Sequence, residues 1–492
     1  MFNGILYTTE VSNYRPISLL TSFSKIYEKL MHNRIVEFMD GNGSFYEMQY
    51  GFRAGRSCEH ALLNAQSILL DSLSKNQISL LLLIDFSKAF DMVEHSILLS
   101  KLNHYGIKGT ALDWLKSYLH NREQFVSVNG KDSTKKAINY GVPQGSILGP
   151  LLFIVYINDM PQIHKLAKFV LYADDANIII TGSNMSEIEE QLHELSGALV
   201  NWVHSNGLAL NLKKTNYMIF SRRRINTDFR LTISNTEIHR KTEARFLGVI
   251  IDEKLTWTPH IVSLKAKMAR YVGIMYKIKH LLPIQARIQI YHSFVQSHIN
   301  FCSLVWGFSS KSNIESLFTN QKKGMRAVMP GYVNFYYRNG EKPTHTKPFF
   351  NQFNVLTVQG IIVKNALVFM NKVYYYPWLL PTSVRETIAV NAPRHGSTFA
   401  TSQDWLSVYG CSSYNKSIFY KGPLLAIDPA CFDTLTVADT VSVNAYKHGI
   451  KRMLLQSQKS GCHNDWESNE FILYSISGLR RSSRLNECNN HL

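Results

Sequence analysis

The stretch FVLYADDANIII, residues 169 to 180, limits the fold more than any other part of the sequence. Its two apolar runs have the aromatic and β-branched residues of buried strands, which predicts a hairpin with Asp174 and Asp175 at its tip. Asp is a common turn residue, so a solvated turn is one interpretation. The other is a hairpin that presents two carboxylates to a divalent cation, since Mg²⁺ prefers oxygen ligands. That interpretation requires a third carboxylate from elsewhere in the chain.

Asp85 is the candidate for the third carboxylate, because it follows directly on the apolar run 80–84. The next apolar positions, Phe90, Val93 and Ile97, have helical spacing, which places Asp85 where a buried strand gives way to a helix. One interpretation is a helix N-cap, for which Asp is a preferred residue. The other is an acidic cluster. If the two strands are neighbours in one sheet, about 4.8 Å apart, their carboxylates are close enough to share two metal ions.

Composition and charge restrict the class of protein and its partners. The 492 residues are 45% apolar and 18% charged, which is typical of a globular chain with room for two to four domains. The formal net charge of +17 indicates an anionic partner, nucleic acid before an acidic membrane surface. No apolar run reaches the length of about 18 residues that spans a bilayer, and the first residues do not resemble a signal peptide. We therefore expect an intracellular protein, in the nucleus, the cytoplasm or both, with no membrane partner.

Basic residues dominate the segment 261–330. A solvated helix face normally mixes both signs of charge, so we interpret this segment as a surface that follows phosphates. Its only acidic residue is Glu315, and its basic residues are Lys265, Lys267, Arg270, Lys277, Lys279, Arg287, Lys311, Lys322, Lys323 and Arg326.

Five motifs in a fixed order resemble a known family. LIDFSKAFD, GVPQGSILGPLLF, LYADD, NGLALNLKKT and RFLGVIID are similar to the successive palm motifs of reverse transcriptases from LINE-type (non-LTR) retrotransposons. Upstream, NYRPISLL and QYGFRAGRS resemble fingers motifs of the same enzymes, and residues 265–328 resemble their helical thumb. Only MFNGILYTTEVS precedes NYRPIS, and no endonuclease domain precedes the motifs, so the resemblance implies an N-terminally truncated member.

The resemblance implies an α+β fold of the right-hand polymerase type. It predicts partial fingers at residues 1–78 and a palm, an antiparallel sheet plus helices, at 79–260. It further predicts a basic helical thumb or connection at 261–330 and an additional C-terminal region of unknown role at 331–492.

The resemblance also implies RNA-directed DNA synthesis by two-metal nucleotidyl transfer from a dNTP to a primer 3′-hydroxyl. The expected partners are an RNA template, a DNA primer or target and the dNTP, and the expected cofactor is Mg²⁺, with Mn²⁺ as a substitute. Asp85 and Asp174 are the expected main metal ligands. Asp175 is expected to support them, and the Phe86 backbone carbonyl to complete a coordination shell.

Further residues are predicted to contact the nucleotide. Arg15 resembles the fingers arginine that grips the triphosphate, and Lys214 is a candidate proton donor to pyrophosphate, with Lys213 as an equal alternative. Gln144 and Gly145 are expected against the nucleotide and template base, although PQGS is also a plain helix start with Ser146 as its cap.

Phe90 matches the family's steric gate beneath the sugar, although it also fits an apolar helix stripe. Asp91 beside it is interpreted as a capping or surface acid.

Six residues are predicted to bind template or primer: Arg53, Arg56, Leu247, Gly248, Lys265 and Lys267. The hairpin of Leu247 and Gly248 resembles the one that grips the primer end, whereas an ordinary apolar strand is the simpler alternative. The rival function is a nucleic-acid-binding remnant without catalysis, and a third alternative is another template-directed polymerase, such as an intron maturase or a telomerase.

Overall fold

The computed structural model describes residues 17–225, 229–329, 346–375, 379–384 and 447–455, without 449 and 453. Contacts divide the chain into two compact units. The first comprises residues up to 61 together with 76–241, and the second comprises 62–75 together with the residues from 242 onward. The predicted fingers, palm, thumb and C-terminal regions stay predictions, because this division is coarser and falls at other positions.

A six-stranded sheet organises the first unit, with the strand order β6-β7-β1-β8-β10-β9. Neighbouring strands are antiparallel except β8 and β10, which are parallel, so the predicted antiparallel sheet is confirmed with one exception. All seven residues of β1 are buried, as expected of a continuous apolar run covered on both faces. The strands are β1 (Ile78–Ile84), β6 (Lys168–Tyr172), β7 (Asp175–Gly182), β8 (Asn216–Phe220), β9 (Leu231–Ile233) and β10 (Thr236–Arg240).

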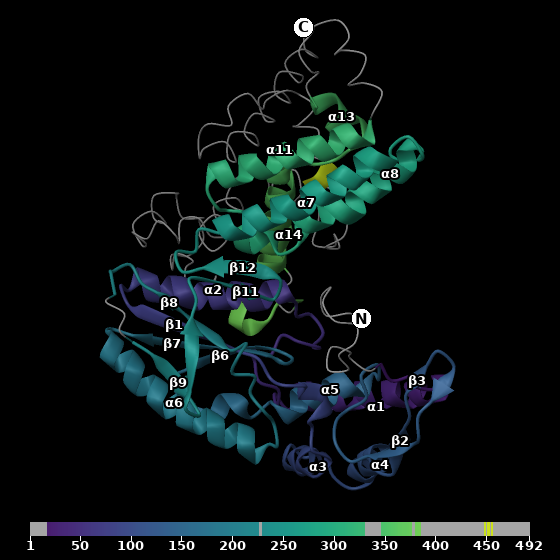
Figure 1. Ribbon diagram of the computed structural model, residues 1–492, viewed down its shortest axis with the longest axis vertical. Coiled ribbons are helices and arrows are strands. Elements are labelled where there is room, and N and C mark those ends of the chain that lie inside the picture. Colours follow the sequence, from purple (N-terminus) through teal and green to yellow (C-terminus); the bar gives the residue numbers. More distant parts are fainter. Residues whose placement is uncertain are drawn as a thin grey trace, which may run out of the picture. The chain divides into compact units, whose positions relative to one another are not determined.

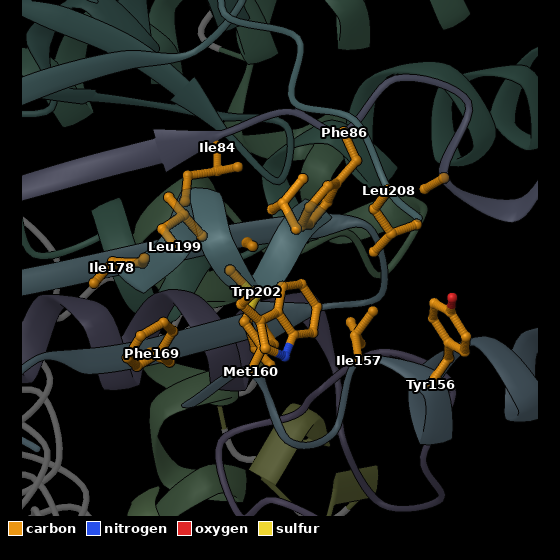
Figure 2. Close-up of a cluster of buried hydrophobic side chains, with 14 of the residues drawn as sticks. Ile84, Phe86, Tyr156, Ile157, Met160, Phe169, Ile178, Leu199, Trp202 and Leu208 are labelled. Carbon is orange, nitrogen blue, oxygen red and sulfur yellow. The ribbon is translucent and has the colours of Figure 1, made fainter. Parts of the chain in front are cut away.

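Helices cover one face of this sheet. The long helix α6 (Met185–Ser205) packs on β7, β1 and β9 and runs along the sheet in Figure 1. Helix α5 (Leu148–Tyr156) has eight of its nine residues buried and belongs to the core. Figure 2 shows how Ile84 and Ile178 of the sheet meet Leu199 and Trp202 of α6 in this core.

Shorter elements complete the first unit. They include two small hairpins, in which β2 pairs with β5 and β3 with β4. Their bounds are α1 (Ser22–Gly41), η2 (Ala89–Asp91), α3 (His95–His104), α4 (Thr110–Leu119), β2 (Arg122–Gln124), β3 (Ser127–Val128), β4 (Lys131–Asp132), β5 (Lys136–Ile138) and η3 (Met160–Ile163).

The second unit is mainly helical. A hairpin of two strands precedes α7, and α11 packs along α7 and α8 (Figure 1). Helix α2 (Cys58–Ser74) belongs to this unit from residue 62 onward. The other elements are β11 (Glu243–Phe246), β12 (Val249–Asp252), α7 (Thr258–Ile278), α8 (Ile284–Tyr291), the π-helical η4 (His292–Gln296), α9 (Ser297–Asn300), α10 (Ser303–Trp306), α11 (Lys311–Val328), α13 (Lys347–Gln352) and α14 (Val358–Tyr375). Within the described part of the chain, no helix is both long and apolar enough to cross a membrane.

Candidate active site

The acidic pair lies at the tip of the β6–β7 hairpin, as predicted. Tyr172 pairs with Asp175, so Ala173 and Asp174 form a two-residue turn. Ala173 has φ 54°, in the left-handed region that is unfavourable for residues other than glycine. The turn therefore needs support from its surroundings to keep this shape.

Asp85 lies at the end of β1 that is next to the tip of the β6–β7 hairpin. Ile84, the last residue of β1, pairs with Ala176 of β7. Continuing this antiparallel register by one residue places Asp85 across from Asp175, with Cα atoms about 5 Å apart. The ends of two neighbouring strands thus bring the three predicted carboxylates, including Asp174, to one place.

The predicted helix start at Asp85 is wrong. After β1 the chain forms only the short η2 helix, and α3 begins at His95. The backbone of Asp85 pairs with a distant segment instead: the Asn211 amide donates to the Asp85 carbonyl at 2.8 Å, and the Ser87 amide donates to the Ala209 carbonyl at 2.8 Å. Asp85 is therefore not a helix cap, and the NGLALN motif holds the chain directly after it.

Lys214 lies beside Asp85. Its Nζ atom is 3.8 Å from Asp85 Oδ2, and the hydroxyl of the next residue, Thr215, accepts from the Asp85 amide at 3.4 Å. Both charged side chains are partly open to solvent, so this ion pair contributes little to stability. Of the two lysines that the sequence left open, Lys214 has its ammonium beside Asp85.

The PQG loop contacts two other predicted motifs. Gly145 has φ 120°, and a Cβ atom there would lie 2.8 Å from the Ser18 carbonyl oxygen, so only glycine fits. The Ser18 amide donates to the Gln144 carbonyl at 2.8 Å. Ser18 belongs to the NYRPISLL motif, whose Arg15 lies outside the described residues. The N-cap of α5 is Ile147 rather than Ser146, but the Ser146 hydroxyl accepts from the Gly149 amide in the first turn of this helix at 2.8 Å.

Gln144 is oriented by Asp91. The amide Nε2 of Gln144 donates to Asp91 Oδ1 at 2.9 Å. The two segments are also paired through their backbones, since the Val142 amide donates to the Phe90 carbonyl at 2.9 Å and the Gly141 amide to the Val93 carbonyl at 2.7 Å. Asp91 is thus the last residue of η2 and not its cap, and it is a partly exposed acid that binds Gln144.

Phe90 is held between two aromatic rings. It stacks on Phe153 with ring centroids 4.4 Å apart, and it meets the ring of Phe52 edge-on at 6.3 Å. Phe90 is only partly buried. Its role as a steric gate stays a prediction, beside the alternative of core packing.

Arg53 and Arg56 are engaged within the protein. Arg53 pairs with Asp40 at 2.7 Å and Arg56 with Glu47 at 2.9 Å, with 13% and 9% of the two arginine side chains exposed. Both positions stay predicted template contacts, although a structural function is now also visible.

Leu247 and Gly248 form the turn between β11 and β12 in the second unit. Both have positive φ, 46° and 86°, as in a two-residue hairpin turn of type I′. The predicted hairpin is confirmed, whereas its contact with a primer stays a prediction. Lys265 and Lys267 lie partly exposed on α7.

His260, at the start of α7, is a buried histidine whose pKa is lowered to about 4, first by burial and then by Lys267 and Arg245. Its Nδ1 accepts from the Ile250 amide at 3.3 Å, which requires the neutral ring. The unfolded chain, with a histidine pKa near 6.5, binds the proton more readily than the folded chain.

We therefore expect stability to fall as the pH decreases from 6.5 to 4, by up to about 3 kcal/mol from this group. Urea unfolding of the parent chain and the His260→Gln variant across this range measures the effect. The variant should show a shallower fall, and equal slopes for both proteins would contradict the expectation.

The carboxylates suit a divalent ion in chemistry and location. Asp85, Asp174 and Asp175 offer only oxygen donors, the kind that Mg²⁺ selects. Among the described residues, however, no three His, Cys, Asp or Glu side chains converge closely enough to hold an ion as they stand. Neighbouring carboxylates repel one another without a cation between them, so convergence upon binding is the expected behaviour. The Phe86 carbonyl, at a bridge with Leu210, stays a predicted ligand.

Comparison with known proteins identifies the domain that carries this site. Residues 8–251 match the family described as "Reverse transcriptase (RNA-dependent DNA polymerase)". The chain belongs to the reverse transcriptase family through this domain, which includes all the carboxylates above.

Its relatives are polymerases of non-LTR transposons. The probable RNA-directed DNA polymerase from transposon X-element of Drosophila melanogaster is 29% identical over 327 residues, which are 65% of this chain and 36% of that protein. The corresponding protein from transposon BS of the same species is 30% identical over 343 residues, 65% of this chain and 37% of the relative. The RNA-directed DNA polymerase from mobile element jockey is 28% identical over 331 residues, 65% of this chain and 36% of the relative. The chain thus spans little more than a third of the length of these relatives.

Glu28 is a buried site-supporting residue that sequence reasoning missed. Only 1% of it is exposed, and its carboxylate accepts from the Ile147 amide at 2.6 Å, at the start of α5 directly after the PQG loop. It also accepts from the Tyr118 hydroxyl at 3.2 Å, and burial together with this carboxylate raises the pKa of Tyr118 to about 12. The α1 sequence shows no pattern that distinguishes Glu28 from its exposed neighbours.

Proposed function

We propose that this chain is an RNA-directed DNA polymerase that extends a primer 3′-hydroxyl with dNTPs on an RNA template, in the presence of Mg²⁺ or Mn²⁺. The observation that carries the proposal is the strand register that puts Asp85, Asp174 and Asp175 at neighbouring ends of β1 and the β6–β7 hairpin, with Lys214 Nζ 3.8 Å from Asp85 Oδ2. Such an acidic edge occurs here inside a reverse transcriptase domain. The named relatives are RNA-directed DNA polymerases, which supports the same activity.

In this reaction the primer 3′-oxygen forms a bond to the α-phosphorus of the dNTP, and the bond to the pyrophosphate oxygen breaks. Two divalent ions held by the three carboxylates would lower the pKa of the hydroxyl and stabilise the charge on the leaving oxygen. Lys214, an ammonium at this edge, is positioned to give a proton to the departing pyrophosphate. Gly145 lets the PQG loop pack against the Ser18 backbone, and the Phe90 ring would exclude a 2′-hydroxyl from the sugar position.

Primer extension tests the proposal directly. The full chain, a DNA primer annealed to an RNA template, the four dNTPs and Mg²⁺ should give full-length product, and EDTA should abolish it. Salt-sensitive RNA binding without any product would instead favour a binding remnant without catalysis. A chain that neither binds nor extends would contradict both functions.

The Asp91–Gln144 contact gives a second expected result. Removal of Asp91 leaves the Gln144 amide free to rotate, so Asp91→Ala should raise the KM for dNTP by about tenfold, the value of one hydrogen bond to a charged group. Gln144→Ala should have a similar effect. Because both changes break one contact, the double variant should be no worse than either single variant. Steady-state kinetics of the two single variants and the double variant measures the KM for dNTP. Additive increases in KM would show that the two residues act separately.

A further inference from the structure

The segment Met48–Gly51 lies beside β6, the outer strand of the β6–β7 hairpin that carries Asp174. β6 is the edge strand of the sheet, and Gln49 forms a parallel bridge with Leu171. The Leu171 amide donates to the Met48 carbonyl at 3.0 Å, and the Tyr50 amide donates to the Leu171 carbonyl at 2.8 Å. All of this segment but Met48 belongs to the QYGFRAGRS stretch, so a predicted fingers motif is joined to the strand that leads to Asp174.

The side chain of Gln49 reaches the turn itself. Gln49 is 1% exposed, and its Oε1 accepts from the Ala173 amide at 3.1 Å and from the Gly51 amide at 2.9 Å. Ala173 is the residue with φ 54°. A non-glycine residue in this conformation costs roughly 1 to 2 kcal/mol, which a buried hydrogen bond to its amide offsets.

Gly51 allows the segment to approach the turn this closely. A Cβ atom at Gly51 would lie 2.4 Å from the Ala173 nitrogen and 2.9 Å from the Tyr172 carbonyl carbon. Both of these are backbone atoms, which cannot move aside as the end of a flexible side chain can. Any other residue at this position must therefore displace either the segment or the turn.

Arg53 and Arg56, which follow the segment, bind residues that precede it. The Arg53 guanidinium donates to the Tyr46 carbonyl at 3.1 Å and pairs with Asp40, and the Arg56 guanidinium donates to the Glu47 carbonyl and side chain. These contacts tie the residues before the segment to those after it. The support of the catalytic turn is thus an internally cross-linked loop.

We propose that Gln49 and Gly51 are positioning residues of the polymerase: they fix the backbone turn from which Asp174 projects, without contacting substrate or metal. The proposal deepens the proposed function and rests on it. It also explains why a buried glutamine precedes GFR in a stretch whose arginines point into the protein.

The test replaces Gln49 by methionine, which has a similar length and no acceptor oxygen. The matched control is Gln191→Met, because Gln191 is a buried glutamine of the same unit, on α6, that donates to the Thr181 carbonyl at 3.3 Å. Hydrogen exchange by mass spectrometry reports on the turn, in a peptide that contains Leu171 to Asp175. We expect about tenfold faster exchange of this peptide in Gln49→Met, and no change in Gln191→Met.

Catalysis is measured as the single-turnover rate of extension per active site. A displaced turn should lower this rate constant about 100-fold, the effect of a misplacement of about 1 Å at the reacting centre. A merely structural role would reduce the fraction of active protein and leave the rate constant of the active molecules unchanged. That result, or unchanged exchange in Gln49→Met, would overturn the proposal.

Gly51→Ala provides an independent variant in case Gln49→Met folds poorly. Its control is Gly197→Ala on α6, where an added Cβ meets no atom within 4 Å. Gly51→Ala should lower the rate constant and speed the exchange as Gln49→Met does, whereas wild-type values would count against the proposal. If the parent chain itself fails to extend a primer, the proposed function fails, and the exchange experiment still decides whether Gln49 holds the turn.

Discussion

Replacement of Asp174 or Asp85 by asparagine should lower primer extension by at least about 10³-fold. Asparagine keeps the shape of the side chain and removes its negative charge, so the hairpin should fold unchanged while the affinity for divalent cations is lost. The metal contribution to such a transition state amounts to several kcal/mol, and about 4 kcal/mol corresponds to 10³-fold. Single-turnover extension of an RNA-templated primer measures the loss, and circular dichroism confirms the fold.

The comparison between carboxylates makes this prediction specific. Asp175 lies in β7 and is the most exposed of the three, so Asp175→Asn should have a smaller effect than Asp174→Asn. Asp132, an exposed aspartate in the small β4 strand, serves as the control for loss of one charge, and Asp132→Asn should extend normally. Full activity of Asp174→Asn, or an equal loss in Asp132→Asn, would exclude the acidic edge as the catalytic centre.

The hairpin of Asp174 was predictable because its determinants are local. Both strands are adjacent in the chain, each is an apolar run, and the break between them contains turn residues. The same holds for the turn at Leu247 and Gly248, where two short strands adjacent in the chain flank a glycine. In each case, neighbouring residues suffice to predict a hairpin, although the exact shape of the Ala173 turn also depends on Gln49.

The segment after Asp85 shows where local patterns fail. Phe90, Val93 and Ile97 have helical spacing, yet the chain up to Glu94 is mostly not helical. Its backbone forms hydrogen bonds with the distant segments around Ala209 and Val142. These long-range bonds satisfy the same polar groups that a helix would satisfy, and they outweigh a weak local preference.

The supports of the site could not be predicted for the same reason. The bond between Gln49 and the Ala173 amide spans 124 residues, and the bond between Glu28 and the Ile147 amide spans 119. Neither glutamine nor glutamate differs in the sequence from an ordinary surface residue. Their functions become visible only when the fold places them beside the turn and the PQG loop.

The second large effect is expected at Phe90, where substitution by valine should relax the discrimination between deoxynucleotides and ribonucleotides. The ring is fixed by stacking on Phe153 at 4.4 Å and by the edge contact with Phe52, so it cannot turn away from a 2′-hydroxyl. A rigid wall excludes a bulkier sugar, whereas valine leaves space for it. We expect the ratio of kcat/KM for dNTP to that for rNTP to fall about 10- to 100-fold, measured by single-nucleotide insertion.

A matched control separates this effect from lost packing. Phe229 is partly buried in the same unit, and its ring meets that of Tyr217 edge-on with centroids 5.7 Å apart. It is distant in the sequence from the three carboxylates of the site. Phe229→Val should cost about 1 to 3 kcal/mol of stability, similar to Phe90→Val, because both remove part of an aromatic ring from a packed environment. Only Phe90→Val should change the sugar preference. An unchanged preference in that variant would assign Phe90 to core packing alone, and the discrimination against the 2′-hydroxyl would have to come from another wall of the nucleotide site.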